Sequence, residues 1–127
     1  MSNEIKARFI KHETELWNEG NLDVAGELFA PDVVIHNAAP GTPAGLEGVK
    51  ATVSGLHAAF SDVEFTIEDP IVEGDTLAHR WSITGKQTGE WMGAPPTGEK
   101  VTMRGVSMVR FANDKIVDIW SAISPSA

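Results

Sequence analysis

The chain has 127 residues, which is enough for one domain with its own core and too short for two. Its net charge of −8 and its lack of a basic run argue against nucleic acid or a membrane as partner, because phosphate binding needs clustered cations. The absence of Cys and Tyr excludes disulfides, thiolate catalysis, Cys-bound zinc and any phenolic proton donor. We therefore expect a single acidic domain over residues 1–127.

The N-terminal segment carries charges throughout and lacks the apolar core of a signal peptide. No stretch approaches the roughly 20 apolar residues that span a bilayer. We expect a cytoplasmic protein, and the absence of Cys is consistent with that compartment.

The first half of the sequence predicts three helices and a short strand. Apolar residues at helical spacing indicate a helix over about residues 3–19 and a shorter one over about 21–29. A third apolar stripe, at intervals of four, three and four residues, indicates a helix over about 47–60. A strand is predicted at 33–36, followed by a loop rich in Pro and Gly at 38–48.

The second half changes to a period of two, which is typical of half-buried strands. Four consecutive strands are predicted to begin near Val63, Leu77, Val101 and Ile116, with a bulge or bend at Pro70. Consecutive strands with short connections pair as an antiparallel meander, and the early helices must cover one of its faces. We therefore predict an α+β fold in which about three N-terminal helices and a curved antiparallel sheet enclose an apolar pocket.

Several motifs, in this order and spacing, resemble the SnoaL-like polyketide cyclases, an ester-cyclase-like branch of the nuclear transport factor 2-like superfamily. The resemblance extends over nearly the whole chain. Its motifs are ELWNEGNLDVAGELFAPDVVIH (Glu15 to His36), GLEGVK (Gly45 to Lys50), HRW (His79 to Trp81), GAPPTG (Gly93 to Gly98) and FANDKIVDIW (Phe111 to Trp120). The resemblance implies a cone-shaped α+β barrel, also called cystatin-like, with a deep apolar pocket, usually as a homodimer.

The resemblance also implies an activity. The characterised cyclases of this family close a ring by intramolecular aldol condensation on a polyketide ester, and they need no metal or organic cofactor. They use an acidic residue late in the last strand. That position falls on Ser121 here, and a His expected on the preceding strand falls on Ser107, so the mechanism does not transfer residue by residue. We expect a hydrophobic, carbonyl-bearing small molecule as ligand and no cofactor.

Proton removal next to a carbonyl needs a base and a group that stabilises the enolate oxygen. Asp118, within the apolar last strand, and His79, on an otherwise apolar strand face, are the candidate catalytic residues. The plainer alternatives are a structural or interface carboxylate and a core histidine. A shift of one residue would exchange Asp118 and Trp120 for Ile119 and Ser121 on the pocket face, and the sequence leaves this register open.

Further candidate ligand contacts are aromatic or polar residues expected near the pocket: His36, Phe60, Trp81, Trp91, Met92, Ser107 and Ser121. Core packing is the alternative role of the aromatic residues. The four His show no spacing typical of a metal site, so none is predicted. Three functions remain open: a cofactor-free enzyme of aldol cyclisation or isomerisation, a non-catalytic binding protein, and a dimeric interaction module. Turnover separates the first two, and saturable ligand binding separates the last two.

Overall fold

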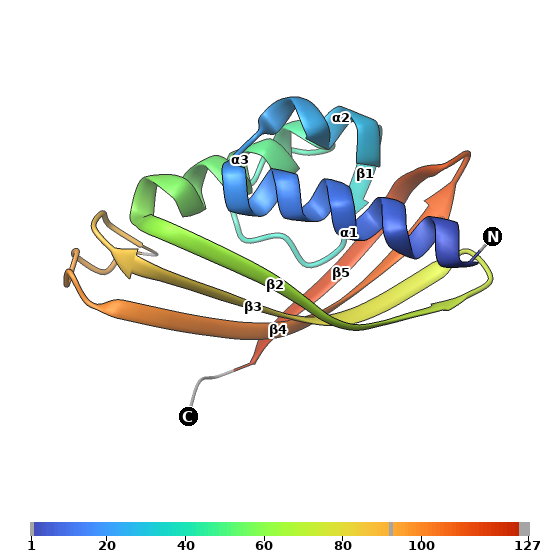
Figure 1. Ribbon diagram of the computed structural model, residues 1–127. Coiled ribbons are helices and arrows are strands. Elements are labelled where there is room, and N and C mark those ends of the chain that lie inside the picture. The colour runs from blue at the N-terminus through green and yellow to red at the C-terminus, as the bar shows by residue number, and fades with distance from the viewer. Residues whose placement is uncertain (1, 92, 125–127) are drawn as a thin grey trace.

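The computed structural model describes residues 2–91 and 93–124. Within these residues, three α-helices lie on one face of a curved five-stranded sheet, which confirms the predicted α+β class (Figure 1). None of the described helices is long and apolar enough to cross a bilayer. The helices are α1 (Ser2–Glu19), α2 (Ala25–Leu28), which follows the 3-10 turn η1 (Leu22–Val24), and α3 (Leu46–Ala59). The strands are β1 (Phe29–Ile35), β2 (Phe60–Glu73), β3 (Thr76–Gln87), β4 (Lys100–Ala112) and β5 (Lys115–Ser124).

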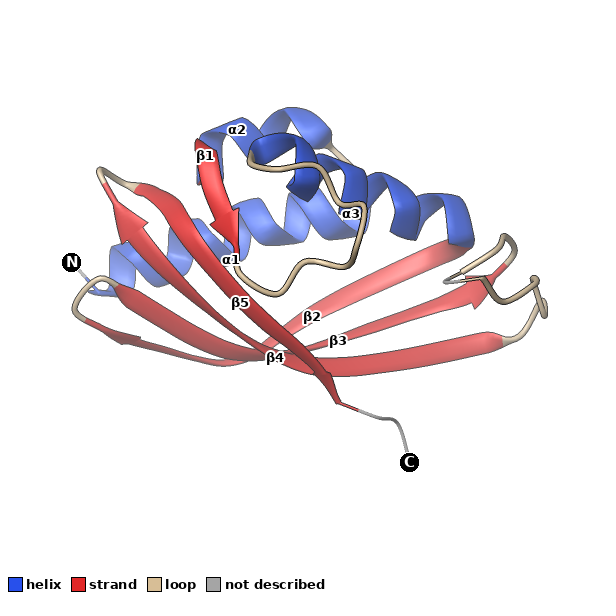
Figure 2. Ribbon diagram, turned by 180° about the vertical axis from the view of Figure 1, so that it is seen from behind, coloured by secondary structure: helices blue, strands red, loops and turns tan. Residues whose placement is uncertain are grey.

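The strands follow the order β1-β5-β4-β3-β2 across the sheet. The last four strands pair as the predicted antiparallel meander, while β1 lies parallel to β5 at one edge (Figure 2). Because β1 and β2 are both edge strands, the sheet in the described residues does not close into the barrel that the resemblance implies. The result is an open, strongly curved sheet with its hollow side toward the helices (Figure 1).

Local backbone features fix this curvature and register. β2 breaks its pairing with β3 between Glu68 and Ile71, and Asp69 adopts a positive φ of 51°, so the bend predicted at Pro70 is confirmed. The turn from β4 to β5 places Asn113 and Asp114 at φ of 51° and 65°. Positive φ at both central residues is typical of a two-residue hairpin whose twist matches the strands.

The helices bury an apolar stripe against the hollow side of the sheet. Phe9 and Leu16 of α1 and Leu77 of β3 are all completely buried in the larger core cluster. A second cluster, around Phe60 and Ile83, fills the space under the end of α3. Residues of both clusters also line a cavity between the helices and the sheet.

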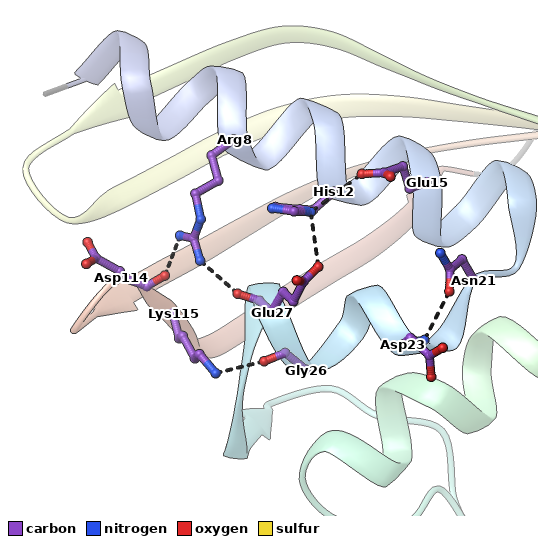
Figure 3. A network of polar contacts seen from close by, with 9 residues as sticks. All are labelled: Arg8, His12, Glu15, Asn21, Asp23, Gly26, Glu27, Asp114 and Lys115. Carbon is purple, nitrogen blue, oxygen red and sulfur yellow. Dashed lines mark hydrogen bonds and ion pairs between the residues drawn. The ribbon is translucent and has the colours of Figure 1, made fainter.

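Polar contacts fasten α1 to α2 and to the turn between β4 and β5 (Figure 3). The Arg8 guanidinium donates to the backbone carbonyl of Glu27 at 2.7 Å and also to that of Asp114. Lys115 Nζ donates to the Gly26 carbonyl at 2.8 Å. The Arg8 contacts hold the N-terminal half of α1 against α2 and the β4–β5 turn, and the Lys115 contact joins α2 to β5.

Candidate functional site

An apolar cavity of about 370 Å³ lies between the helices and the hollow face of the sheet. This inner cavity takes its walls from α1, α3 and the sheet, and its apolar lining includes Trp17, Leu56, Phe65, Trp81, Trp91 and Ile119. The loop between β1 and α3, visible in Figure 2, contributes Ala38, Ala39 and Thr42 to the lining. A cavity of this size and polarity suits a small organic molecule.

Three polar residues cross the floor of the inner cavity on neighbouring strands. His79 of β3 lies opposite Ser107 of β4, which lies opposite Ser121 of β5. The Trp81 indole Nε1 donates to Ser107 Oγ at 2.9 Å, and the two Ser hydroxyls share a hydrogen bond. We call His79, Ser107 and Ser121 the polar row. Ser107 and Ser121 are hydrogen-bonded to each other, and His79 lies beside Ser107 with its own contact to the Arg80 backbone.

His79 is suited to accept a proton. Its side chain is only 5% exposed and packs edge-on against Phe9 of α1, with 5.0 Å between ring centroids. Its Nδ1 lies 3.2 Å from the carbonyl oxygen of Arg80. A carbonyl only accepts, so Nδ1 carries the proton and Nε2 keeps a free lone pair. Burial lowers the pKa of His79, against the smaller effect of its bond to Arg80, so the ring is neutral at pH 7.

Glu13 is an acidic residue in the same cavity and was not among the predicted site residues. It is 5% exposed, lines the cavity from α1, and accepts a hydrogen bond from Trp17 Nε1 at 2.5 Å. Burial raises the pKa of Glu13 to about 8, although the Trp17 hydrogen bond acts in the opposite direction. The signal was present in the sequence, because Glu13 follows Phe9 by four residues and precedes Leu16 by three in the apolar stripe.

The structure settles the register of the last strand. Ile119, Ser121 and Ile123 line the inner cavity, so the alternate residues Asp118 and Trp120 face the other side of the sheet. The structure therefore does not bring Asp118 and His79 together. The catalytic role of Asp118 stays a prediction.

Asp118 instead belongs to a charged cluster on the outer side of the sheet. His36 Nε2 lies 2.8 Å from Asp118 Oδ1, and the Arg110 guanidinium donates to Oδ2. The hydrogen bond with His36, followed by the contacts with Arg110, holds the pKa of Asp118 below its usual range. A carboxylate fixed between two partners in this way is suited to holding β1, β4 and β5 together.

A second, open hollow of about 770 Å³ lies on the outer face of the sheet. We call it the outer groove, and its apolar lining includes Ile71, Ala78, Val106, Met108, Trp120 and Ala122. Ile71 and Val106 are 65% and 52% exposed. His36 lies at this groove and stacks on Trp120, with ring centroids 4.3 Å apart.

The remaining predicted ligand contacts divide between these places. Trp81, Trp91, Ser107 and Ser121 line the inner cavity. Phe60 is buried and packs edge-on against Trp91 at 5.3 Å, so it supports the cavity wall from behind. Met92 lies outside the described residues. Within residues 2–91 and 93–124, no group of three or more His, Asp or Glu side chains could bind a metal ion.

Comparisons with known proteins match the fold of this chain. A family model described as SnoaL-like polyketide cyclase matches residues 7–126. The chain is similar to the solved structure of IdmH, a candidate polyketide cyclase from Streptomyces antibioticus, at 33% identity and a TM-score of 0.76, covering 96% of this chain and 91% of that one. It is also similar to AclR, a candidate hydroxylase from Streptomyces galilaeus, at 27% identity and a TM-score of 0.81, covering 96% and 90%.

A third structure, TsrD from Streptomyces laurentii, has a TM-score of 0.89 at 21% identity and covers 95% of this chain and 89% of that one. At that identity the likeness concerns the fold alone. A comparison with curated protein sequences found no match.

Proposed function

Because the chain belongs to the SnoaL-like polyketide cyclase family, we propose that its inner cavity binds a hydrophobic, carbonyl-bearing small molecule and catalyses proton transfer at carbon. The reaction class is aldol cyclisation or isomerisation, with the protein's own side chains as acid and base. The observation that carries this proposal is His79, a neutral imidazole in a row of hydroxyl groups on an apolar floor. This arrangement supplies a base and hydrogen-bond donors to the same bound molecule.

His79 Nε2 is the proposed base for the proton next to the carbonyl. Trp81 donates to Ser107, and when Ser107 donates in turn to Ser121, the Ser121 hydroxyl is free to donate to a ligand oxygen. Donors fixed in an apolar site interact strongly with a developing enolate, because little water is present to screen them. The polar row therefore has the parts for enolisation without Asp118.

A non-catalytic binding protein is the alternative function. Ser121 supports it, because the resemblance places the acid of the characterised cyclases at this position. The same cavity would then hold its ligand by apolar contact and by hydrogen bonds to the polar row. The two functions differ in turnover and agree in saturable binding.

The proposal is tested by carbon–proton exchange in D₂O, followed by NMR with ethyl benzoylacetate and with 1-tetralone, whose background exchange is slow. We expect exchange above buffer that falls roughly a hundredfold in His79→Asn, the usual loss for a missing base. The Asn amide keeps a donor for the Arg80 carbonyl and lacks the basic nitrogen Nε2. His57→Gln is the matched control, since His57 Nε2 contacts the Trp17 carbonyl at 2.7 Å, a contact that an amide can replace.

Quenching of Trp fluorescence measures binding of the same probes, because Trp17, Trp81 and Trp91 line the cavity. Saturable quenching without exchange would favour the binding protein over the enzyme. Exchange that is equal in the wild type and His79→Asn would keep the enzyme and reject His79 as its base.

For the assembly, we propose a homodimer in which the outer groove of one copy faces that of a second. Ile71, Val106 and Met108 lie together in this groove with large exposed apolar surfaces. Contiguous apolar patches on a protein surface commonly mark interaction sites. The family resemblance implies the same partner, a second copy of the chain.

A further inference from the structure

We propose that Glu13 is the proton donor of the inner cavity, a carboxylic acid that donates from α1 to the carbonyl oxygen of the ligand whose α-proton His79 removes. The inference rests on the proposed function and makes it more specific. It assigns an acid to the roof of the cavity, opposite the base on the floor, and it selects ligands that carry a hydrogen-bond-accepting oxygen.

The position of Glu13 follows from its neighbours on α1. Phe9, one turn earlier, packs edge-on against His79, and Trp17, one turn later, stacks on Phe65 of β2 at 5.8 Å. Each turn advances the helix by about 5.4 Å. Glu13 therefore lies on the side of α1 that faces the sheet, one turn along the helix from the contact with His79. The two side chains line one cavity from opposite walls.

The surroundings of Glu13 keep its carboxyl group neutral. Among the described residues that line the inner cavity, Glu13 and His79 are the only titratable ones. The lining from α3, β1 and β2 carries no charge, and β4 and β5 add only the hydroxyls of Ser107 and Ser121. With no cation on these walls, burial dominates and raises the pKa of Glu13 to about 8.

Trp17 determines which carboxyl oxygen can act on a ligand. Its indole N–H can only donate, and it donates to Oε2 of Glu13. An oxygen that accepts this bond fits the carbonyl oxygen of a carboxylic acid, which places the acidic hydroxyl at Oε1. Oε1 is thus the atom available to donate to the ligand, with Trp17 holding the group in position.

The proton balance closes between the two side chains. His79 Nε2 takes the α-proton while Glu13 gives its proton to the carbonyl oxygen, which yields an enol, an imidazolium and a carboxylate. For aldol closure, the enol carbon then attacks a second carbonyl carbon of the same ligand. The imidazolium protonates the new alkoxide, and Glu13 takes back the proton of the enol hydroxyl. Both groups return to their starting states, so no oxidant, reductant or co-reactant is needed.

Glu13→Gln tests the inference because Gln keeps the size of the side chain, its neutrality and an acceptor for Trp17, and loses only the transferable proton. In the D₂O exchange experiment we expect a loss of about a hundredfold or more with binding of ethyl benzoylacetate unchanged. Glu19→Gln, the same change at an exposed site on the same helix, is the control and should exchange like the wild type. Exchange in Glu13→Gln within about threefold of wild type would overturn the inference and leave the function of His79 standing.

A second measurement does not depend on turnover. In protein labelled with ¹³C at the Glu carboxyl carbons, the Glu13 signal is identified by its absence in Glu13→Gln. We expect it to report a protonated acid at pH 7 and to shift when ethyl benzoylacetate saturates the cavity. The inference would be overturned if the Glu13 carboxyl ionised below pH 6. It would also be overturned if the Glu13 signal did not shift when ethyl benzoylacetate binds. A protonated, ligand-responsive Glu13 in a protein without exchange would support the donor and reject the proposed catalysis.

Discussion

The Trp17 indole donates a hydrogen bond to the Glu13 carboxyl group across one turn of α1, at 2.5 Å and within an apolar cavity. Burial acts on Glu13 and on His79 in opposite directions, raising the pKa of the acid and lowering that of the base. At neutral pH the acid therefore holds its proton while the base lacks one. That is the distribution of protons with which a paired acid and base begin a reaction.

The raised pKa of Glu13 predicts a specific dependence of stability on pH. The Glu13 carboxyl has its ordinary pKa of 4.5 in the unfolded chain and a pKa of about 8 in the folded protein. Its contribution to stability is therefore fully present below pH 4.5 and is lost as the pH rises through 8. We expect the difference in unfolding free energy between wild type and Glu13→Gln to change by on the order of 4 kcal/mol between pH 5 and pH 8.5.

Urea denaturation of both proteins at several pH values measures this difference. The lowered pKa values of His79 and Asp118 affect stability only below their ordinary values of 6.5 and 3.8. Neither group therefore changes the stability in the upper part of this pH range. Parallel stability profiles for wild type and variant would show that Glu13 is ionised in the folded protein.

The same two groups predict a bell-shaped dependence of the exchange rate on pH. Protonation of His79 removes the base, and because its pKa is lowered, the acid limb lies below pH 6.5. Ionisation of Glu13 removes the donor, so the alkaline limb lies near pH 8. Exchange rates for 1-tetralone from pH 5 to 9.5 give the profile. In Glu13→Gln the decrease in rate at alkaline pH should be absent. A wild-type rate that rises steadily to pH 9.5 would contradict the assignment of Glu13 as the proton donor.

The sequence predicted the fold well because its strongest signals are local. The period of two after Val63 and the bend at Pro70 were both confirmed, and so was the family, whose motifs follow the chain in order. The inward face of β5 could not be predicted, because both of its faces carry apolar residues. Glu13 was missed for a related reason. Its position in the apolar stripe was visible in the sequence, but its burial depends on how the sheet packs against α1 in the folded protein.

Asp118→Asn tests whether the outer cluster stabilises the fold without taking part in the reaction of the inner cavity. Because the pKa of Asp118 is lowered, its carboxylate stabilises the fold above the ordinary pKa of 3.8, and this stability is lost as the pH falls through the lowered pKa. We expect a lower urea midpoint at pH 7 and no difference from wild type at the acid extreme, while exchange stays within about threefold of wild type. Asp32→Asn, at an exposed position on β1, is the control. A loss of exchange near a hundredfold in Asp118→Asn would restore Asp118 as the base.

Gly105 makes room for the Trp81 indole. A Cβ at this position would lie 2.3 Å from Trp81 Cζ2 and 2.4 Å from the Ala122 carbonyl oxygen. Gly105→Ala must displace Trp81 from Ser107, at a cost of about 1–3 kcal/mol, and should shift the Trp emission. Gly55→Ala is the opposite case, because its added Cβ meets nothing within 4 Å and lies inside α3. That variant should gain about 0.5–1 kcal/mol. If both variants changed the free energy of unfolding in urea by the same amount, the close packing of Trp81 over Gly105 would be contradicted.

The proposed homodimer predicts that a charge in the outer groove separates the two copies. Val106 is 52% exposed and lines the groove, so Lys at this position leaves the folded chain intact but places a cation against the second copy. A buried, unpaired charge at an interface costs several kcal/mol, so dissociation should become at least about a hundredfold easier. Val34→Lys is the matched control, since Val34 is 48% exposed on β1 and is not part of the groove lining.

Sedimentation velocity at micromolar concentration distinguishes the outcomes. We expect dimers for the wild type and Val34→Lys and a monomer for Val106→Lys. A monomeric wild type would contradict the proposed homodimer. If Val106→Lys remained dimeric, the interface would lie outside the outer groove. Because the groove and the inner cavity lie on opposite faces of one sheet, monomeric Val106→Lys should keep its exchange activity if the site is built within a single copy.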